Sequence, residues 1–279
     1  MNGKKKLNVY LRLSTLIGIV LLFACTNKQA ESTDQSDPDS KTNSALSQEV
    51  FNPLEHNYKL VWQDEFDGDQ LDLTKWRHRG TGPRRIGYND PKMVKVENGN
   101  LLLMYDIQGK DSIMAGVVGT QATYMTKYGY FECRARMQRS IGPWAAFWIQ
   151  SPSIAQGEDP GEYGAEIDIF EYFRNPPPDQ DKTTHCVHWA YGPNQKSIGA
   201  RTSTLEGIGE GFHTYALEWT PEKYAFYIDG LKFHEVEEGI SHIEQYMILS
   251  MEIPATLEAL KKACAPDTMM VDYVRVYQK

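Results

Sequence analysis

The sequence predicts an antiparallel all-β domain built as a sandwich of two sheets. The segment Lys127–Met137 alternates with period two, so Phe131, Cys133, Ala135 and Met137 fall on one face of a strand. Residues 213–219 repeat this alternation. From Leu60 to the C-terminus short strands and turns follow one another without a βαβ rhythm, which favours a sandwich.

The second half of the chain continues this pattern. Tyr224–Ile228 reads as a strand, Asp229-Gly230 is typical of a type I′ hairpin turn, and Leu231–His234 reads as the returning strand. Residues 270–277 predict a last strand. The only helical stretch we expect is Ala255–Ala263.

The N-terminus predicts an export signal. Lys4–Lys6 precede an apolar run, Leu16–Ala24, which is shorter than the roughly 20 residues of a membrane span. Leu22–Cys25 resembles a bacterial lipoprotein signal, in which cleavage leaves Cys25 as the lipid-bearing residue; a plain signal or a short anchor is the alternative. We expect a signal peptide at 1–24, a lipid-anchored protein of the cell envelope at the outer membrane or cell surface, a flexible tether at 25–57, and a catalytic domain at 58–279.

The net charge of the chain limits the kinds of molecule that it can be expected to bind. The formal net charge is -8, and residues 1–24 carry four cations and no acid, so the chain without them has -8 - 4 = -12. Such a surface repels nucleic acids and anionic lipid headgroups. We therefore expect a neutral or locally selected ligand, no nucleic acid, membrane attachment through lipid only, and a monomer. Cys133, Cys186 and Cys264 form no complete disulfide framework, although one bridge is permitted; we expect each to be a small buried hydrophobe.

The strand Glu166-Ile167-Asp168-Ile169-Phe170-Glu171 carries the strongest chemical signal. Glu166 and Asp168 lie two apart and share a face, whereas Glu171 is at an odd offset. One extra residue in a β-bulge near Ile169-Phe170 would bring Glu171 to the same face. Three carboxylates on one face repel one another, so their pKa values should spread and one proton be shared. A retaining glycosidase needs this arrangement, with an ionised nucleophile and a protonated acid about 5–5.5 Å apart. A half-exposed structural strand and a calcium site are the alternatives.

This strand resembles the E-x-D-x-x-E signature of glycoside hydrolase family 16 in its bulged form, the form of laminarinases, agarases, porphyranases and carrageenases. The resemblance covers the whole domain through the segments 60–68, 96–101, 128–132, 144–148, 213–219 and 271–277. It implies a concanavalin A-like β-jelly-roll sandwich of two antiparallel sheets with a sugar-binding cleft on the concave sheet. By the resemblance, Glu166 is the nucleophile, Glu171 the acid/base, and Asp168 the residue that holds the nucleophile and tunes both pKa values; no cofactor is needed for catalysis.

The resemblance also implies residues around the cleft. Trp144 and Trp148 lie four apart and would form a platform for pyranose rings, with core packing as the alternative. His188 matches a family position facing the cleft, although a structural role is a rival. His185 lies at an odd offset from His188, so the two do not form a metal pair.

A loop between the segments 60–68 and 96–101 holds a second group of candidate residues. Tyr88 and Asn89 follow Arg84-Arg85 in a loop that the family places at the non-reducing end of the cleft. Arg85 and its neighbour could recognise a sulfate or carboxylate on the substrate, while solvated loop charges are the plainer interpretation. These arginines, and Ala145 where β-1,3-glucanases commonly have Pro, depart from the laminarinase pattern. Glu65, Gly99 and Asp272 match positions that bind a structural calcium in many members; surface acids without a metal are the alternative.

We therefore predict a retaining endo-β-glycanase with β-1,3-glucan as the leading substrate. A β-linked galactan such as agar, porphyran or carrageenan is the second candidate, favoured by Arg84-Arg85. A non-catalytic glycan-binding lipoprotein is the rival of another class, and three mutually repelling acids argue against it.

Overall fold

The computed structural model of this chain describes residues 46, 49–108, 112–261 and 263–279, which fall within one compact unit. The expected signal peptide, Cys25 and most of the expected tether lie outside the described residues. No helix in the described ranges is long and apolar enough to cross a membrane.

The first of two sheets, sheet A, contains eleven strands. They are β1 (Lys59–Asp64), β3 (Gly82–Arg84), β4 (Gly87–Asn89), β5 (Val94–Glu97), β6 (Asn100–Gln108), β7 (Ser112–Ala115), β9 (Gly129–Arg136), β15 (His213–Trp219), β16 (Tyr224–Ile228), β17 (Leu231–Val236) and β19 (Asp267–Gln278). Their order is β17-β16-β15-β9-β19-β6-β7-β4-β3, with β1 beside β19 and β5 beside β6. Among the strands in the described ranges, only β4 and β7 pair in parallel.

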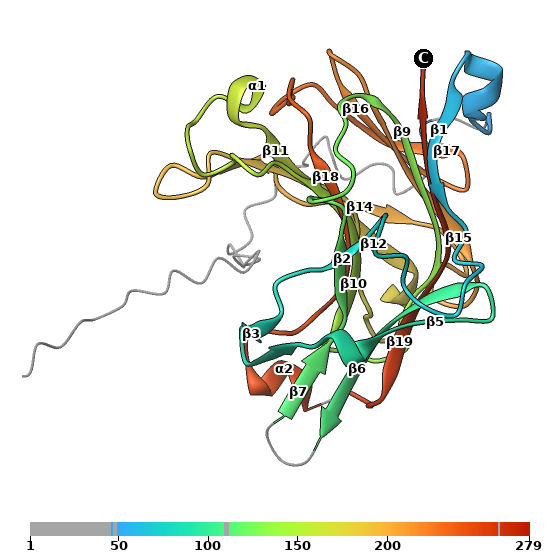
Figure 1. Cartoon of the computed structure of the whole chain (residues 1–279), viewed down its shortest axis with the longest axis vertical. Coiled ribbons are helices and arrows are strands. Elements are labelled where there is room, and N and C mark those ends of the chain that lie inside the picture. The colour runs from blue at the N-terminus through green and yellow to red at the C-terminus, as the bar shows by residue number, and fades with distance from the viewer. Residues whose placement is uncertain (1–45, 47–48, 109–111, 262) are drawn as a thin grey trace, which may run out of the picture. The chain divides into compact units, whose positions relative to one another are not determined.

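The second sheet, sheet B, contains eight strands and faces sheet A (Figure 1). They are β2 (Arg77–His78), β8 (Val117–Gly119), β10 (Trp144–Gln150), β11 (Ala165–Phe173), β12 (Lys182–Trp189), β13 (Lys196–Ser197), β14 (Arg201–Thr204) and β18 (Tyr246–Glu252). Their order is β13-β12-β11-β10-β18-β8-β2, with β14 beside β12. The short helices are α1 (Pro160–Tyr163), α2 (Leu257–Leu260), η2 (Pro53–His56), η3 (Pro91–Met93) and η4 (Asp179–Asp181). The predicted two-sheet, all-β architecture is confirmed.

One hydrophobic core fills the space between the sheets, and period two decides which side chains enter it. Phe131, Cys133, Ala135 and Met137 are all buried there, as the alternation predicts. The hairpin turn is also confirmed, because Asp229 and Gly230 have φ of 50° and 75° and a type I′ turn needs both residues left-handed. The expected helix at Ala255–Ala263 is shorter than predicted, since only α2 forms there.

A second, smaller cluster covers the outer face of sheet A. Phe51 packs against Tyr130 and Tyr227, with ring centroids 5.1 Å away in both cases, and its N–H donates to the carbonyl of Gly230. Tyr130 is therefore buried on the face that alternation alone leaves to solvent. The folded domain thus begins before residue 58, and the last residues of the expected tether are part of it.

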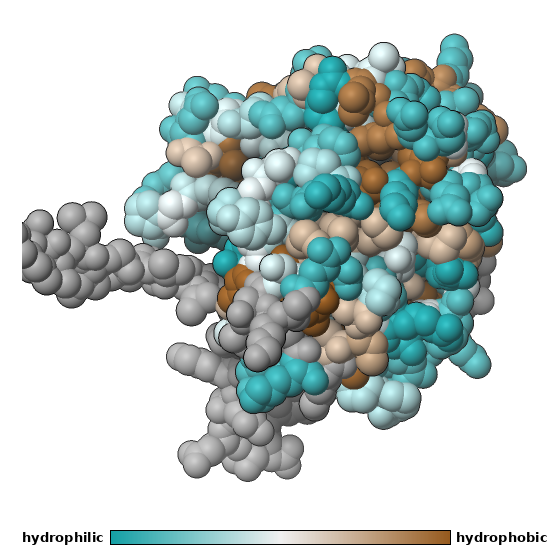
Figure 2. Space-filling model, turned by 60° about the horizontal axis from the view of Figure 1, so that its bottom comes forward, coloured by the Kyte–Doolittle hydropathy of each residue, from teal (hydrophilic) through white to brown (hydrophobic). Residues whose placement is uncertain are grey.

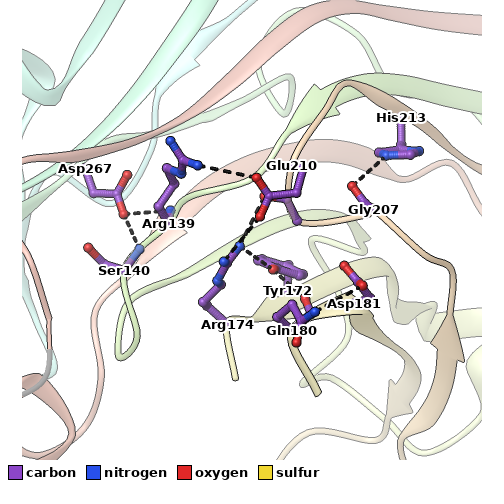
Figure 3. A network of polar contacts seen from close by, with 11 residues as sticks. Arg139, Ser140, Tyr172, Arg174, Gln180, Asp181, Gly207, Glu210, His213 and Asp267 are labelled. Atoms are coloured by element: carbon purple, nitrogen blue, oxygen red, sulfur yellow. Dashed lines mark hydrogen bonds and ion pairs between the residues drawn. The ribbon is translucent and has the colours of Figure 1, made fainter. Parts of the chain in front are cut away.

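A polar network fixes the end of β11, the strand that carries the three acids (Figure 3). Arg174 donates to the hydroxyl of Tyr172 and pairs with Glu210, which also pairs with Arg139. Asp267 accepts the backbone N–H groups of Arg139 and of the next residue, Ser140. Loops from three parts of the chain are thereby tied to the strand that carries the acids.

The outer surface of the described domain is mostly polar. Figure 2 shows hydrophilic side chains over one face, with smaller apolar areas between them. Among the described residues, the exposed large hydrophobic side chains include Tyr88 and Phe173. Phe173 ends the carboxylate strand, so an apolar surface lies beside the acids.

Candidate active site

The carboxylate strand lies in the middle of sheet B as β11, between β10 and β12. On β10, Glu166 pairs with Gln150 and Glu171 with Ala146, so five steps on β11 match four on its neighbour. The register shifts between Asp168 and Glu171 on the β12 side as well. The predicted bulge at Ile169-Phe170 is therefore confirmed, and Glu171 joins Glu166 and Asp168 on one face.

A buried histidine completes the bulge. His185 Nδ1 lies 2.6 Å from the carbonyl oxygen of Ile169, and its Nε2 lies 2.8 Å from Ser203 Oγ. Burial lowers the pKa of His185 to about 3, so the ring is neutral. A carbonyl only accepts, so Nδ1 carries the proton and Nε2 accepts from the serine. His185 thus hydrogen-bonds the Ile169 carbonyl, which the bulge removes from the strand ladder. Its odd offset from His188 puts it on the opposite face of β12.

The three acids differ in their electrostatics. Burial raises the pKa of Glu171 to about 7, and the neighbouring Glu166 and Glu252 carboxylates act in the same direction. Burial and the charges of Glu166 and Glu171 raise the pKa of Asp168 well above its usual value. Burial also raises the pKa of Glu166, but hydrogen bonds from Tyr191 and Gln150 oppose the shift. Glu166 is thus the acid best prepared to ionise, while Asp168 retains a proton.

The support of Glu166 comes from residues that the sequence did not single out. Gln150 Nε2 donates to Glu166 Oε2 at 2.8 Å. Gln150 Oε1 in turn accepts from Arg79 at 2.6 Å and from the Tyr246 hydroxyl at 2.7 Å. This chain orients the amide so that its N–H faces Glu166. Gln150 lies four residues after Ala146 on β10, so period two predicts that it lies on the same face of the strand. No pattern in the sequence predicts that Arg79 reaches this site.

The two predicted tryptophans lie on the same face of β10, as expected. Trp144 Nε1 donates to Glu171 Oε1 at 2.9 Å, and its ring stacks on Phe173 with centroids 5.0 Å apart. Trp148 is buried, with its Nε1 donating to Ser250 Oγ and the Arg79 guanidinium 5.0 Å from its ring. Trp144 is partly buried beside the acids, with Phe173 and Arg85 against its ring, and Trp148 offers little surface. Sugar binding by either stays a prediction.

A hollow of about 550 Å³ continues from the Trp144–Phe173 stack. Its lining includes Gly142, Pro143, Phe173, Arg174, Thr256 and Glu258. Because Phe173 belongs to both the stack and the hollow, an extended ligand has room on this side of Glu171.

The Arg84-Arg85 pair has a buried acid as its partner. Glu252 ends β18 opposite Trp144, and its Oε2 lies 2.9 Å from Arg84 and 2.6 Å from Arg85. Arg85 also lies 4.6 Å from the ring of Trp144. Burial raises the pKa of Glu252, but the two arginines outweigh it and hold the pKa below its usual range. The interpretation as solvated loop charges is therefore wrong, since each guanidinium is held in the site by a buried carboxylate.

His188 lies beside Asp168, with Nε2 3.5 Å from Asp168 Oδ2. Burial lowers the pKa of His188, but a hydrogen bond with Cys186 and the carboxylates of Glu166 and Glu171 outweigh it and raise the pKa overall. Its Nδ1 is buried without a hydrogen-bond partner. His188 thus faces the acids, as the resemblance implies.

Two further predicted residues lie on β4. Tyr88 is 53% exposed, whereas Asn89 is buried beside Gly80. Tyr88 alone of this pair presents its side chain to solvent. Ligand binding by either residue stays a prediction.

The residues of the expected calcium site are engaged by arginines. Both carboxylate oxygens of Glu65 accept from Arg275 at 2.8 Å, and Asp272 pairs with Arg134. These donors already compensate the two charges, so the arrangement does not fit a cation as it stands. Calcium binding at Glu65, Gly99 and Asp272 stays a prediction.

The three cysteines of the domain are free thiols. Cys133 and Cys186 are buried, as expected, but Cys264 is exposed. The expectation for Cys264 is wrong because it lies in the loop between α2 and β19 and not in a sheet.

Comparison with known proteins identifies the family. The family model described as the GH16 domain of beta-porphyranases A–D matches residues 59–279. The chain is 26% identical to the keratan-sulfate endo-1,4-beta-galactosidase of Sphingobacterium multivorum over 98% of this chain and 68% of that protein. It is 28% identical to the beta-glucanase of Rhodothermus marinus over 80% of this chain and 86% of that protein. The laminarinase structure from Flavobacterium sp. UMI-01 superposes with a TM-score of 0.65 at 26% identity, covering 79% of this chain and all of that one. The chain therefore belongs to glycoside hydrolase family 16 and is an enzyme that hydrolyses O-glycosyl bonds.

Proposed function

We propose that this enzyme cleaves internal β-glycosidic bonds by double displacement, with Glu166 as nucleophile, Glu171 as acid/base and Asp168 as a positioning residue. The observation that supports these roles is the bulge, which puts the three acids on one face. Their surroundings support these roles as well, since hydrogen bonds from Tyr191 and Gln150 favour the ionised form of Glu166 and burial raises the pKa of Glu171 to about 7.

The chemistry follows from those protonation states. Ionised Glu166 attacks the anomeric carbon, and the glycosidic oxygen leaves with the proton of Glu171. Ionised Glu171 then takes a proton from water, whose oxygen attacks the same carbon and releases Glu166. Two inversions give net retention. Protonated Asp168 keeps a second charge away from Glu166 while the first one reacts.

For the substrate, β-1,3-glucan is the leading candidate. The beta-glucanase and laminarinase relatives support it. The exposed ring of Phe173, which stacks on Trp144 beside Glu171, suits the apolar face of a pyranose.

A second candidate, a sulfated β-galactan, is favoured by the arginines of the cleft. Arg79, Arg84 and Arg85 approach the site, and Glu252 is the carboxylate that pairs with two of them. This part of the site is therefore more cationic than the acidic chain around it. The names of the porphyranase model and of the keratan-sulfate galactosidase point to the same substrate class.

Incubation with laminarin, lichenan, agarose, porphyran and carrageenan, followed by sizing of the products, tests the proposal. Oligosaccharide ladders from one polysaccharide identify the linkage, and binding without cleavage of any of them would instead support the glycan-binding rival. KM for a sulfated substrate should rise with salt because screening weakens the arginine contacts, whereas KM for laminarin should not.

We also propose that the domain is exported as a monomer and held to the cell envelope through a lipid on Cys25. The basic and apolar residues before Cys25 support this. Labelling with a radioactive fatty acid should mark the chain but not Cys25→Ala, and size-exclusion chromatography of the domain should give one copy. Unlabelled native chain would contradict the anchor.

A further inference from the structure

Three potential metal ligands lie together beside the catalytic acids. Asp168 on β11 pairs directly with Cys186 on β12, and His188 follows two residues later on the same face. One ligand atom from each residue can be chosen so that all lie within 4.8 Å of one another. This is the only such group of three found in the described part of the chain.

The spacing of these atoms is close to that of a tetrahedral site. Zinc bonds of about 2.0–2.3 Å require ligand atoms roughly 3.3–3.8 Å apart. His188 Nε2 and Asp168 Oδ2 are already 3.5 Å apart. Small side-chain rotations bring the remaining separations, none above 4.8 Å, into the same range.

The hydrogen bonding of His188 bears on how freely its ring can turn. Its Nδ1 is buried and has no partner. The ring is thus not locked by a protein hydrogen bond at this nitrogen. Because the two ring nitrogens point in different directions, Nε2 is the one that faces Asp168 and would hold the ion.

From this cluster we infer that Asp168, Cys186 and His188 bind a soft divalent cation such as Zn²⁺, with a fourth position left open, and that the bound ion inhibits the hydrolase. A thiolate and an imidazole favour zinc or cobalt over calcium and magnesium. Binding releases the protons of the thiol and of the Asp168 carboxyl, and a protonated imidazole gives up its proton as well.

Inhibition follows from the loss of Asp168 to the metal. The bound ion takes the carboxylate that faces Glu166 and places two positive charges beside the nucleophile. It also fixes His188 away from the sugar. This inhibition rests on the proposed roles of the acids, whereas metal binding does not.

Titration of the chelator-treated protein with Co²⁺ tests binding. One equivalent should give a thiolate-to-cobalt absorption band in the near ultraviolet, and Zn²⁺ should displace it. Cys186→Ser should lose the band and bind at least about tenfold more weakly. Cys264→Ser, which removes an exposed thiol, should keep the absorption band and the native affinity for the metal.

The same variants test inhibition, with each rate expressed relative to that variant's own metal-free rate. Half-inhibition of Cys186→Ser should need at least about tenfold more Zn²⁺ than that of the native chain or Cys264→Ser. Melting without metal checks that Cys186→Ser folds, and Cys186→Ala replaces it if it does not. A native chain without the thiolate band at one equivalent would overturn the site. A native band with no loss of activity would overturn the inhibition alone.

Discussion

The indole Nε1 of Trp144 donates a hydrogen bond of 2.9 Å to Oε1 of Glu171. This donor stabilises the ionised carboxylate and so opposes the effect of burial, which raises the pKa of Glu171. Trp144→Phe removes the donor and keeps an aromatic ring. Because the proposed acid must be protonated, activity falls as pH rises through this pKa, and the alkaline limb of kcat/KM should move up by about one pH unit.

Trp148→Phe is the matched control for this experiment. The Nε1 of Trp148 donates to Ser250 and not to a catalytic acid. Its substitution should leave the position of the alkaline limb unchanged, whatever happens to KM. An equal shift in both variants would mean that the Trp144 hydrogen bond does not tune Glu171.

Glu171 should reduce the stability of the folded chain at alkaline pH. Its pKa is raised from 4.5 to about 7, so between these values the folded chain holds a proton that the unfolded chain has released. Stability therefore falls as pH rises through this window. Glu171→Gln should cut turnover by roughly 10²–10⁴-fold. It should also stabilise the fold at pH 8 by on the order of 2 kcal/mol.

Thermal melting against pH measures this effect. Glu97→Gln, which removes an exposed carboxylate on β5, is the control and should melt like the native chain. If Glu171→Gln melted at a lower temperature than the native protein at pH 8, the buried charge of Glu171 would not be the cause of the lower stability at alkaline pH.

The bulge should depend on His185. His185→Ala leaves the carbonyl of Ile169 without its partner, and an unsatisfied buried carbonyl costs about 1–3 kcal/mol. Loss of the ring leaves a cavity in addition. We expect a lower Tm and a kcat reduced more than KM is changed, because Glu171 follows the bulge directly. His234→Ala, which removes a neighbouring histidine that bonds Thr202 at the surface, should have the smaller effect.

Calcium removal should leave the domain intact. Arg275 and Arg134 already pair with Glu65 and Asp272, so each of these two carboxylates has a cationic partner without an ion. EGTA should not lower Tm, and added Ca²⁺ should not raise it. A calcium-dependent rise in Tm would restore the predicted structural site.

Period two made much of the fold and the acid trio predictable. It gave the buried face of β9 and the bulge, because Glu171 reaches the face of Glu166 and Asp168 only through an extra residue. The Asp229-Gly230 dipeptide gave the hairpin. The helix was overestimated, since within residues 255–263 only α2 (Leu257–Leu260) is described as helical.

Of the residues that support the acids, only Gln150 has a local signal, because period two places it on the same face of β10 as Trp144 and Trp148. Arg79, Gln150 and Glu252 come from three separate strands or loops, and only the register of sheet B brings them to one site. Tyr130 is buried for a similar reason, since its cover, Phe51, lies in a segment whose polar composition predicted a tether. Each of these depends on contacts between distant parts of the chain.

Trapping of the glycosyl-enzyme intermediate tests the proposed roles most directly. Glu171→Gln lacks the base that activates water. An activated glycoside with a good leaving group should therefore glycosylate the nucleophile, and the reaction should stop at that intermediate. Mass spectrometry of the digested protein should then find the sugar on Glu166. A sugar on Asp168, or a first product of inverted configuration with no trapped intermediate, would contradict the proposed mechanism.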